Sequence, residues 1–211
     1  MKLYATPRSH FSRKVRILLE LYSIPYEFID VGNVADSDEV LSKEARIIKE
    51  LTKDDFRECY KRSEITDQDL LLLNNSYYTK LGLQGTSVTG LGLGVLSGLS
   101  NVTSLTIRNT KIKDFSFLRK MSGLKSLHAG DSSIDNFVME SVGKLKKLRN
   151  LDLWGTKVDC IGIEKLRSLT QIKNLNVPSL GITNDCLPVI GRFTKMNVLD
   201  LNKTDVTDKG L

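Results

Sequence analysis

Cysteine is scarce in this sequence, and its few copies form no metal-binding or redox motif. The 211 residues include only three cysteines, Cys59, Cys160 and Cys186, with no C-x-x-C pair and no cysteine–histidine cluster. Zinc and iron–sulfur sites need closely spaced ligands of these types. An odd, widely spaced set is typical of reduced structural thiols, so we expect no disulfide, no metal site and no bound cofactor.

Long apolar runs are also missing. No segment approaches the ~18 consecutive apolar residues of a membrane span, and the opening residues MKLYATPRSHFSRKVR lack the apolar stretch of a signal peptide. We therefore expect a cytoplasmic protein without a membrane partner.

Neither sign of charge dominates the chain. The 31 basic residues give a net charge of +6, but 25 acidic residues are mixed among them. Because a nucleic-acid-binding surface needs clustered positive charge, we do not expect a nucleic-acid partner.

A Leu-x-apolar signature recurs through the second half of the sequence. Its copies begin at Leu81, Leu105, Leu127, Leu151, Leu175 and Leu199, which gives steps of 24, 22, 24, 24 and 24 residues. An apolar block with helical spacing follows each copy. Each unit is therefore expected to form a strand, a turn, a short helix and a second turn.

This pattern resembles the leucine-rich-repeat family, in particular the type with a T-x-V-T-D-x-G-L stretch between strand and helix. The resemblance covers about residues 65–211, and a weaker half-copy is expected at residues 63–73. It implies an α/β fold: a solenoid with a curved parallel sheet and short helices on the convex side. In five of the six units a hydroxyl is expected to bond to backbone groups after the strand; these are Thr86, Thr110, Ser132, Thr156 and Thr204, and Leu180 interrupts the series in the fifth unit.

The first 36 residues have a different pattern. Residues 2–6 and 26–31 are expected to be parallel strands on either side of a helix at about 10–22. The segment KLYATPRSHFSRKVRILLELYSIPYEFIDV resembles the start of the glutathione transferase N-terminal domain, which is thioredoxin-like. That resemblance implies Ser9 as the candidate catalytic hydroxyl and glutathione as the ligand. The sequence departs from the family because no proline occurs between Pro25 and Pro178, where a cis-proline would help to hold glutathione.

Three segments are expected: a βαβ fragment at 1–36, a helical connector with a degenerate first repeat at 37–63, and the repeats at 64–211. A βαβ unit has the same strand direction as the repeat units. We therefore expect residues 1–36 and the polar helix at about 37–55 to cap the solenoid.

A partner is expected to bind on the concave side of the sheet. Side chains alternate along a strand, so residues between the inward leucines face that side. The candidate contacts are Arg108, His128, Asp152, Trp154, Asn176 and Asp200. We expect Arg108, His128 and Trp154 to form a lateral row. For Trp154, packing beside Pro178 is the alternative.

The sequence favours a non-enzymatic module that binds a protein partner on the concave face. The alternative is a glutathione-binding protein or residual glutathione transferase that uses the N-terminal fragment. The last repeat has no polar cap after Leu211, so a homodimer through Leu199, Leu201 and Leu211 is expected if the chain is not part of a longer one.

Overall fold

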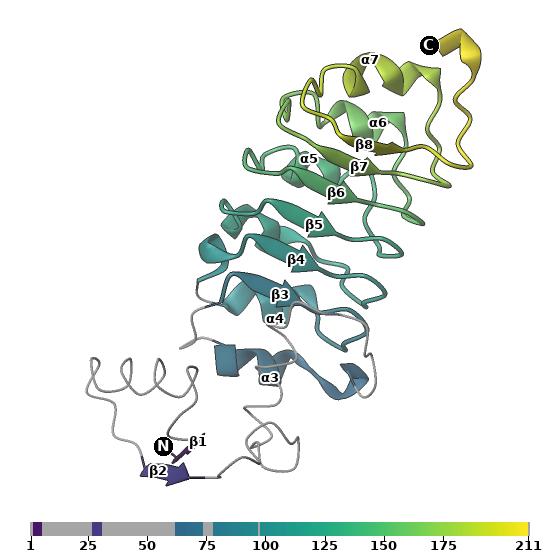
Figure 1. Cartoon of the computed structure of the whole chain (residues 1–211). Helices are drawn as coiled ribbons and strands as arrows, with labels where there is room; N and C mark the ends of the chain where they lie inside the picture. Colours follow the sequence, from purple (N-terminus) through teal and green to yellow (C-terminus); the bar gives the residue numbers. More distant parts are fainter. Residues whose placement is uncertain (1, 6–26, 31–61, 74–77, 97, 211) are drawn as a thin grey trace. The chain divides into compact units, whose positions relative to one another are not determined.

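The computed structural model describes residues 2–5, 27–30, 62–73, 78–96 and 98–210 (Figure 1). The expected helices at 10–22 and 37–55, and the weak strand near residues 58–60, lie outside these residues. Contacts divide the chain into two compact units, Met1–Ile48 and Lys49–Leu211.

Two short strands are described in the first unit. Strand β1 (Lys2–Ala5) pairs in parallel with β2 (Glu27–Asp30), with Leu3 opposite Phe28. The expected parallel pairing of these two segments is confirmed.

The second unit contains a parallel sheet of six strands in sequence order. The strands are β3 (Lys80–Gly82), β4 (Ser104–Thr106), β5 (Ser126–His128), β6 (Asn150–Asp152), β7 (Asn174–Asn176) and β8 (Val198–Asp200). In the register, the first leucines of all six copies lie side by side, from Leu81 to Leu199. The repeat pattern therefore predicted the strands and their register correctly.

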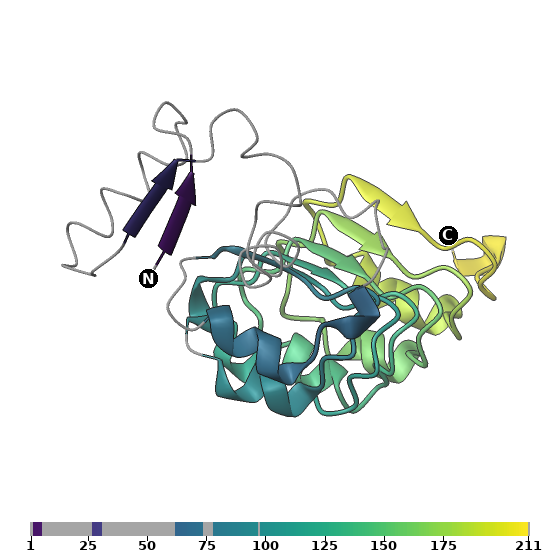
Figure 2. The same cartoon turned by 90° about the horizontal axis from the view of Figure 1, so that it is seen from below.

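Short helices cover one side of this sheet and leave the other side open (Figure 2). They are η2 (Arg62–Glu64), α3 (Asp67–Leu70), η3 (Leu71–Leu73), α4 (Gly90–Val95), η4 (Leu99–Asn101), η5 (Ser116–Lys120), α5 (Met139–Val142), α6 (Cys160–Glu164), η6 (Asn184–Cys186), α7 (Leu187–Ile190) and η7 (Asp208–Gly210). Inward leucines such as Leu151 and helix residues such as Ile163 are both buried. Stacking thus builds the continuous core that one unit alone could not form.

The turn after each strand contains one residue in the left-handed region. These residues are Gly85, Asn109, Asp131, Gly155, Ser179 and Lys203, with φ between 49° and 69°. They repeat with the same steps as the strands. Glycine adopts this conformation without steric cost and Asn or Asp tolerates it, so the strain falls mainly on Ser179 and Lys203.

The expected hydroxyl ladder is confirmed at four of its five positions. The hydroxyls of Thr86, Thr110, Thr156 and Thr204 donate to the carbonyl three residues earlier, at 2.8, 2.9, 2.7 and 2.6 Å. Ser132 is the exception, because its buried hydroxyl has no hydrogen-bond partner.

The expectation of reduced thiols is wrong for two of the three cysteines. Cys160 and Cys186 form a disulfide, with their Cα atoms 5.0 Å apart. They are separated by 26 residues in the sequence, but they lie in consecutive repeats at the starts of neighbouring helices. Only the stacking of the repeats brings them together. Cys59 lies outside the described residues.

Candidate functional site

The open side of the sheet, which we call the open face, carries its polar side chains in rows across the strands. The central row consists of Thr106, His128, Asp152, Asn176 and Asp200, which are neighbours in the strand register. Four of the six candidate contacts therefore lie in one line, each on its own strand.

Arg108 and Trp154 lie in a second row, two residues further along their strands. Continuing the register places Gly130 between them, whereas His128 is paired with Thr106 and Asp152. The expected lateral row of Arg108, His128 and Trp154 is therefore wrong. The three residues share a face, but His128 is one residue after its leucine and the other two are three residues after theirs.

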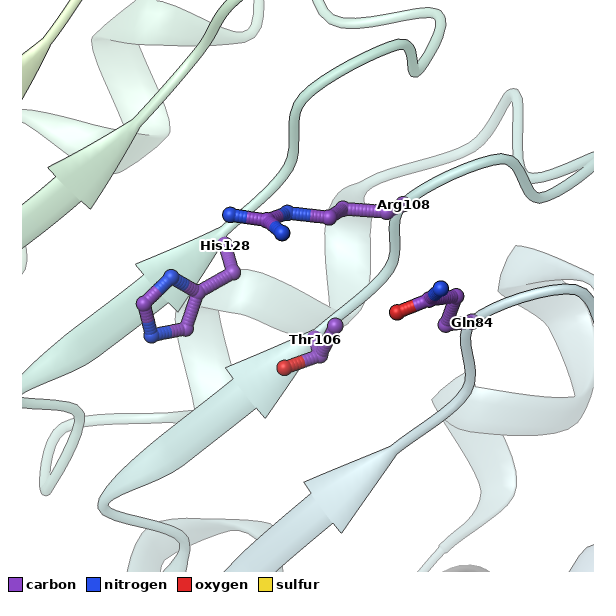
Figure 3. A pocket seen from close by; sticks show the side chains of 4 residues that line it. All are labelled: Gln84, Thr106, Arg108 and His128. Atoms are coloured by element: carbon purple, nitrogen blue, oxygen red, sulfur yellow. The ribbon is translucent and has the colours of Figure 1, made fainter. Parts of the chain in front are cut away.

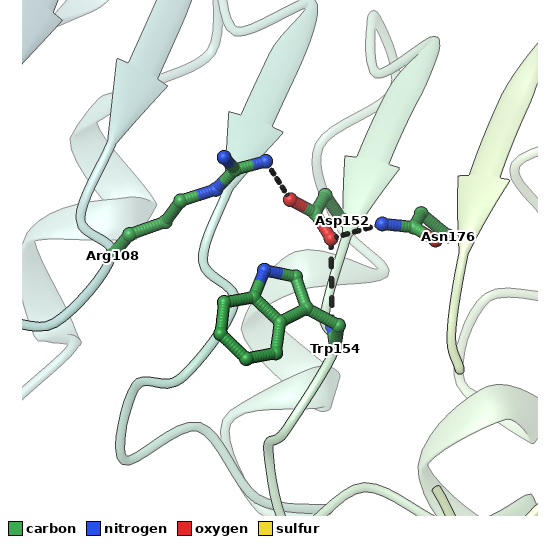
Figure 4. A network of polar contacts seen from close by, with 4 residues as sticks. All are labelled: Arg108, Asp152, Trp154 and Asn176. Atoms are coloured by element: carbon green, nitrogen blue, oxygen red, sulfur yellow. Dashed lines mark hydrogen bonds and ion pairs between the residues drawn. The ribbon is translucent and has the colours of Figure 1, made fainter. Parts of the chain in front are cut away.

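An ion pair joins the two rows (Figure 4). The Arg108 guanidinium donates to one carboxylate oxygen of Asp152. The other oxygen, Oδ1, accepts from Asn176 Nδ2 at 2.7 Å and from the Trp154 backbone N–H at 3.4 Å. The Asp152 side chain is only 7% exposed. A carboxylate this well buried requires such compensation, so the network fixes four residues of the open face relative to one another.

The Trp154 indole lies over Gly130 in the preceding repeat. A Cβ atom on Gly130 would overlap the indole nitrogen and the adjacent carbons, so a residue with any side chain would displace the ring. The indole thus turns toward the preceding repeat (Figure 4). Trp154 nevertheless remains 38% exposed, which leaves a large, fixed apolar surface among polar neighbours.

Gln84, Thr106, Arg108 and His128 line an open hollow of about 160 Å³ beside this network (Figure 3). Burial lowers the pKa of His128 below 6.5, the positive charge of Arg108 lowers it further, and Asp152 opposes both effects. His128 is therefore neutral at physiological pH, where its imidazole has one donor and one acceptor nitrogen.

A third polar row was missed in the sequence. Asn174 Nδ2 donates to Asn150 Oδ1 at 2.8 Å, and Asn150 Nδ2 donates to Ser126 Oγ at 2.7 Å. These residues precede the first leucine of their strands and so lie on the same face as the residues that follow it. Asparagine at the same position in two successive copies was the available signal.

The remaining candidates lie apart from this network. Asp200 is at the end of the central row, where its Oδ1 accepts from the Asn202 N–H at 2.9 Å. Ser9 lies outside the described residues. Within the described part of the chain, no three His, Cys, Asp or Glu side chains are grouped as metal ligands would be. None of the helices described has the length and apolar character that crossing a membrane requires.

Comparison with solved structures supports the leucine-rich-repeat fold. An internalin from Listeria monocytogenes is similar over 66% of this chain, with 19% identity and a TM-score of 0.51. Internalin C2 from the same organism covers 68% of the chain at 16% identity and the same TM-score of 0.51. A leucine-rich-repeat protein of Leptospira interrogans covers 66% at 18% identity, also with a TM-score of 0.51.

The similar part amounts to 45% of the first internalin and 40% of the Leptospira protein. At these identities the comparison supports the fold alone. The repeats are thus a leucine-rich-repeat solenoid, as the sequence indicated.

The N-terminal resemblance is also supported. Residues 3–47 match the family model described as the glutathione S-transferase N-terminal domain. No curated protein has a detectably similar sequence.

Proposed function

We propose that this chain is a non-enzymatic module that binds a protein partner on the open face of its repeat sheet. The observation that carries the proposal is Trp154, a partly exposed indole held over Gly130 beside the hydrogen-bonded Arg108–Asp152–Asn176 network. Interface hot spots favour tryptophan and arginine that are rigid before the partner arrives.

The polar rows supply the rest of the surface. Because Asp152 already compensates the charge of Arg108, the centre of the face offers amides, a neutral imidazole and an indole instead of strong charge. Such a surface suits a partner segment with mixed apolar and hydrogen-bonding groups. Arg108, His128, Asp152, Trp154, Asn176 and Asp200 are the contacts we propose.

Site-specific photo-crosslinking tests this proposal. A benzophenone amino acid is placed at Asp200 on the open face and, in a matched variant, at Lys165, an exposed residue at the end of α6. We expect one protein to crosslink to the first variant and not to the second. Crosslinking of the same protein from Lys165 alone would contradict binding on the open face.

A glutathione-linked function is the second candidate, and the match of residues 3–47 to a glutathione transferase domain model favours it. It would make Ser9 the hydroxyl that contacts the glutathione sulfur. Calorimetric titration with reduced glutathione, repeated on Ser9→Ala, tests it. Binding that Ser9→Ala weakens would support this function, whereas no heat at millimolar glutathione would exclude it.

We also propose that the protein is cytoplasmic.

We propose further that this chain can self-associate through its last described strand. Leu199 on β8 is 40% exposed, whereas the equivalent Leu175 is fully buried. An open strand edge with an exposed apolar side chain favours pairing with another copy. Light scattering at high concentration should show a dimer, and Leu199→Lys should yield a monomer. A monomeric wild-type mass would rule the dimer out.

A further inference from the structure

Neighbouring repeats are linked by a recurring contact at the start of their helices. A side-chain oxygen in one repeat accepts the backbone N–H of the residue before the next helix. Asp67 accepts from Thr89 at 2.7 Å, Asn136 from Asp159 at 3.0 Å, and Asn184 from Thr207 at 2.9 Å. We call this place the acceptor position. Asn184 thus bonds across repeats.

A glycine of the next repeat faces each of these oxygens. A Cβ atom on Gly162 would lie 2.5 Å from Asn136 Oδ1, and one on Gly210 would lie 2.5 Å from Asn184 Oδ1. Gly92 faces Asp67 in the same way. An acceptor oxygen therefore leaves no room for a side chain at the facing position.

Cys160 and Cys186 occupy this pair of positions in the interface between α6 and η6. Cys160 is 24 residues from both Asn136 and Asn184, and Cys186 is 24 residues from both Gly162 and Gly210. Cys160 Sγ still lies 3.4 Å from the Thr183 N–H nitrogen and 3.4 Å from Thr183 Oγ1. A disulfide therefore replaces a contact between an acceptor oxygen and a glycine, and the two cysteines are coupled structurally.

We propose that the Cys160–Cys186 disulfide is a redox-sensitive cross-link between the two repeats that carry Trp154 and Asn176. Cys186 is only 1% exposed, and two unbonded sulfur atoms need more space than two bonded ones. Reduction therefore forces the repeats to shift or a thiol to rotate. The cross-link is reduced in a reducing compartment and forms in an oxidising one.

The chemistry is thiol–disulfide exchange. Two low-molecular-weight thiols give two electrons to the pair, the Sγ–Sγ bond breaks, and each cysteine sulfur takes up one proton released by the donor thiols. The two donor thiols become joined as a disulfide. Oxidation by that disulfide is the reverse exchange.

Reduction of this cross-link should affect the open face. Asp152 and Trp154 belong to the repeat of Cys160, and Asn176 belongs to the repeat of Cys186. Because Asn176 bonds to Asp152 across the same interface, loosening this interface disturbs the surroundings of Trp154. As the only tryptophan, Trp154 reports on the change by fluorescence.

The test compares the full chain with a redox-insensitive variant built from its own repeats. The double substitution Cys160→Asn/Cys186→Gly restores the oxygen and glycine of the adjacent interfaces. We expect air-oxidised, denatured wild-type protein to show one free thiol of its three cysteines. Dithiothreitol should lower the wild-type melting temperature by roughly 5–10 °C and shift its tryptophan emission, while the double variant should not respond.

Hydrogen exchange on oxidised and reduced wild-type protein provides a second measurement that needs no variant. Reduction should accelerate exchange in residues 160–210 more than in residues 78–130, because repeats open as separate units. Three free thiols in the oxidised protein, or identical exchange and melting in both states, would overturn the proposal.

Discussion

Arg108 and Asp152 form an ion pair although they are two repeats apart, 44 residues along the chain. The guanidinium reaches past β5 to the carboxylate on β6, and its Nε is buried without a hydrogen-bond partner. In this pair the Arg108 side chain spans one intervening strand, and the Asp152 carboxylate that accepts from it is buried. Its contribution to stability should differ from that of an ordinary surface pair.

Removing this ion pair should cost more than removing an exposed one. Arg108→Met removes the cationic partner of the buried Asp152 carboxylate, so we expect the free energy of unfolding to fall by about 1–3 kcal/mol. The matched control is Arg167→Met, since Arg167 pairs with Glu164 at 3.0 Å with both side chains exposed. That change should cost less than about 0.5 kcal/mol. Urea unfolding of both variants measures the difference, and equal losses would contradict the prediction.

The left-handed turn position predicts opposite effects for two substitutions. Gly85 has open space around its Cα, with no atom within 4 Å of an added Cβ, so Gly85→Ala should lose about 1 kcal/mol from backbone strain alone. Lys203, at a φ of 57°, carries that strain already. Lys203→Gly should therefore gain about 0.5 kcal/mol or more. If Gly85→Ala melts like the wild type, backbone strain does not act at this position.

Gly130→Ala should displace the Trp154 indole. The added methyl group would overlap the ring, and overpacking of this kind costs about 1–3 kcal/mol. We expect lower stability and a red-shifted tryptophan emission. Gly94→Ala is the control, because nothing lies within 4 Å of its added Cβ. An unchanged emission in Gly130→Ala would show that the indole does not rest on Gly130.

His128 should make stability depend on pH in the acidic range. Its pKa in the folded protein lies below 6.5 because of burial and Arg108, so the unfolded chain binds its proton more readily. The stability that His128 contributes is complete above pH 6.5 and is lost as the pH falls toward its folded pKa. Relative to His128→Gln, the wild type should lose stability between pH 7.5 and 5.5. An NMR titration that places its pKa above 6.5 would refute this.

The sequence predicted the repeat, the register and most of the hydroxyl ladder, because each depends on side chains that recur within a single unit. Leu81 and its equivalents are fixed by the need to bury one face of every strand. The disulfide was not predictable in the same way. Cys160 and Cys186 meet only because one repeat stacks on the next with an offset of two residues beyond the 24-residue step.

Contacts across the open face were the least predictable part of the site. Which row His128 joins depends on an offset of two residues, and the position of the Trp154 indole depends on the absence of a side chain at Gly130. A glycine in a strand pattern is a weak signal until its neighbour on the next strand is known. The face was therefore assigned correctly from alternation, while its internal pairing was not.

The most direct test of binding on the open face is the affinity of the crosslinked partner for Trp154→Ala, with folding verified by circular dichroism. Lys165→Ala on the helix side is the control. If the indole is the anchor, Trp154→Ala should weaken binding by roughly 30-fold or more, as expected for a central interface hot spot, and Lys165→Ala should bind like the wild type. Unchanged affinity for Trp154→Ala would contradict the proposed site.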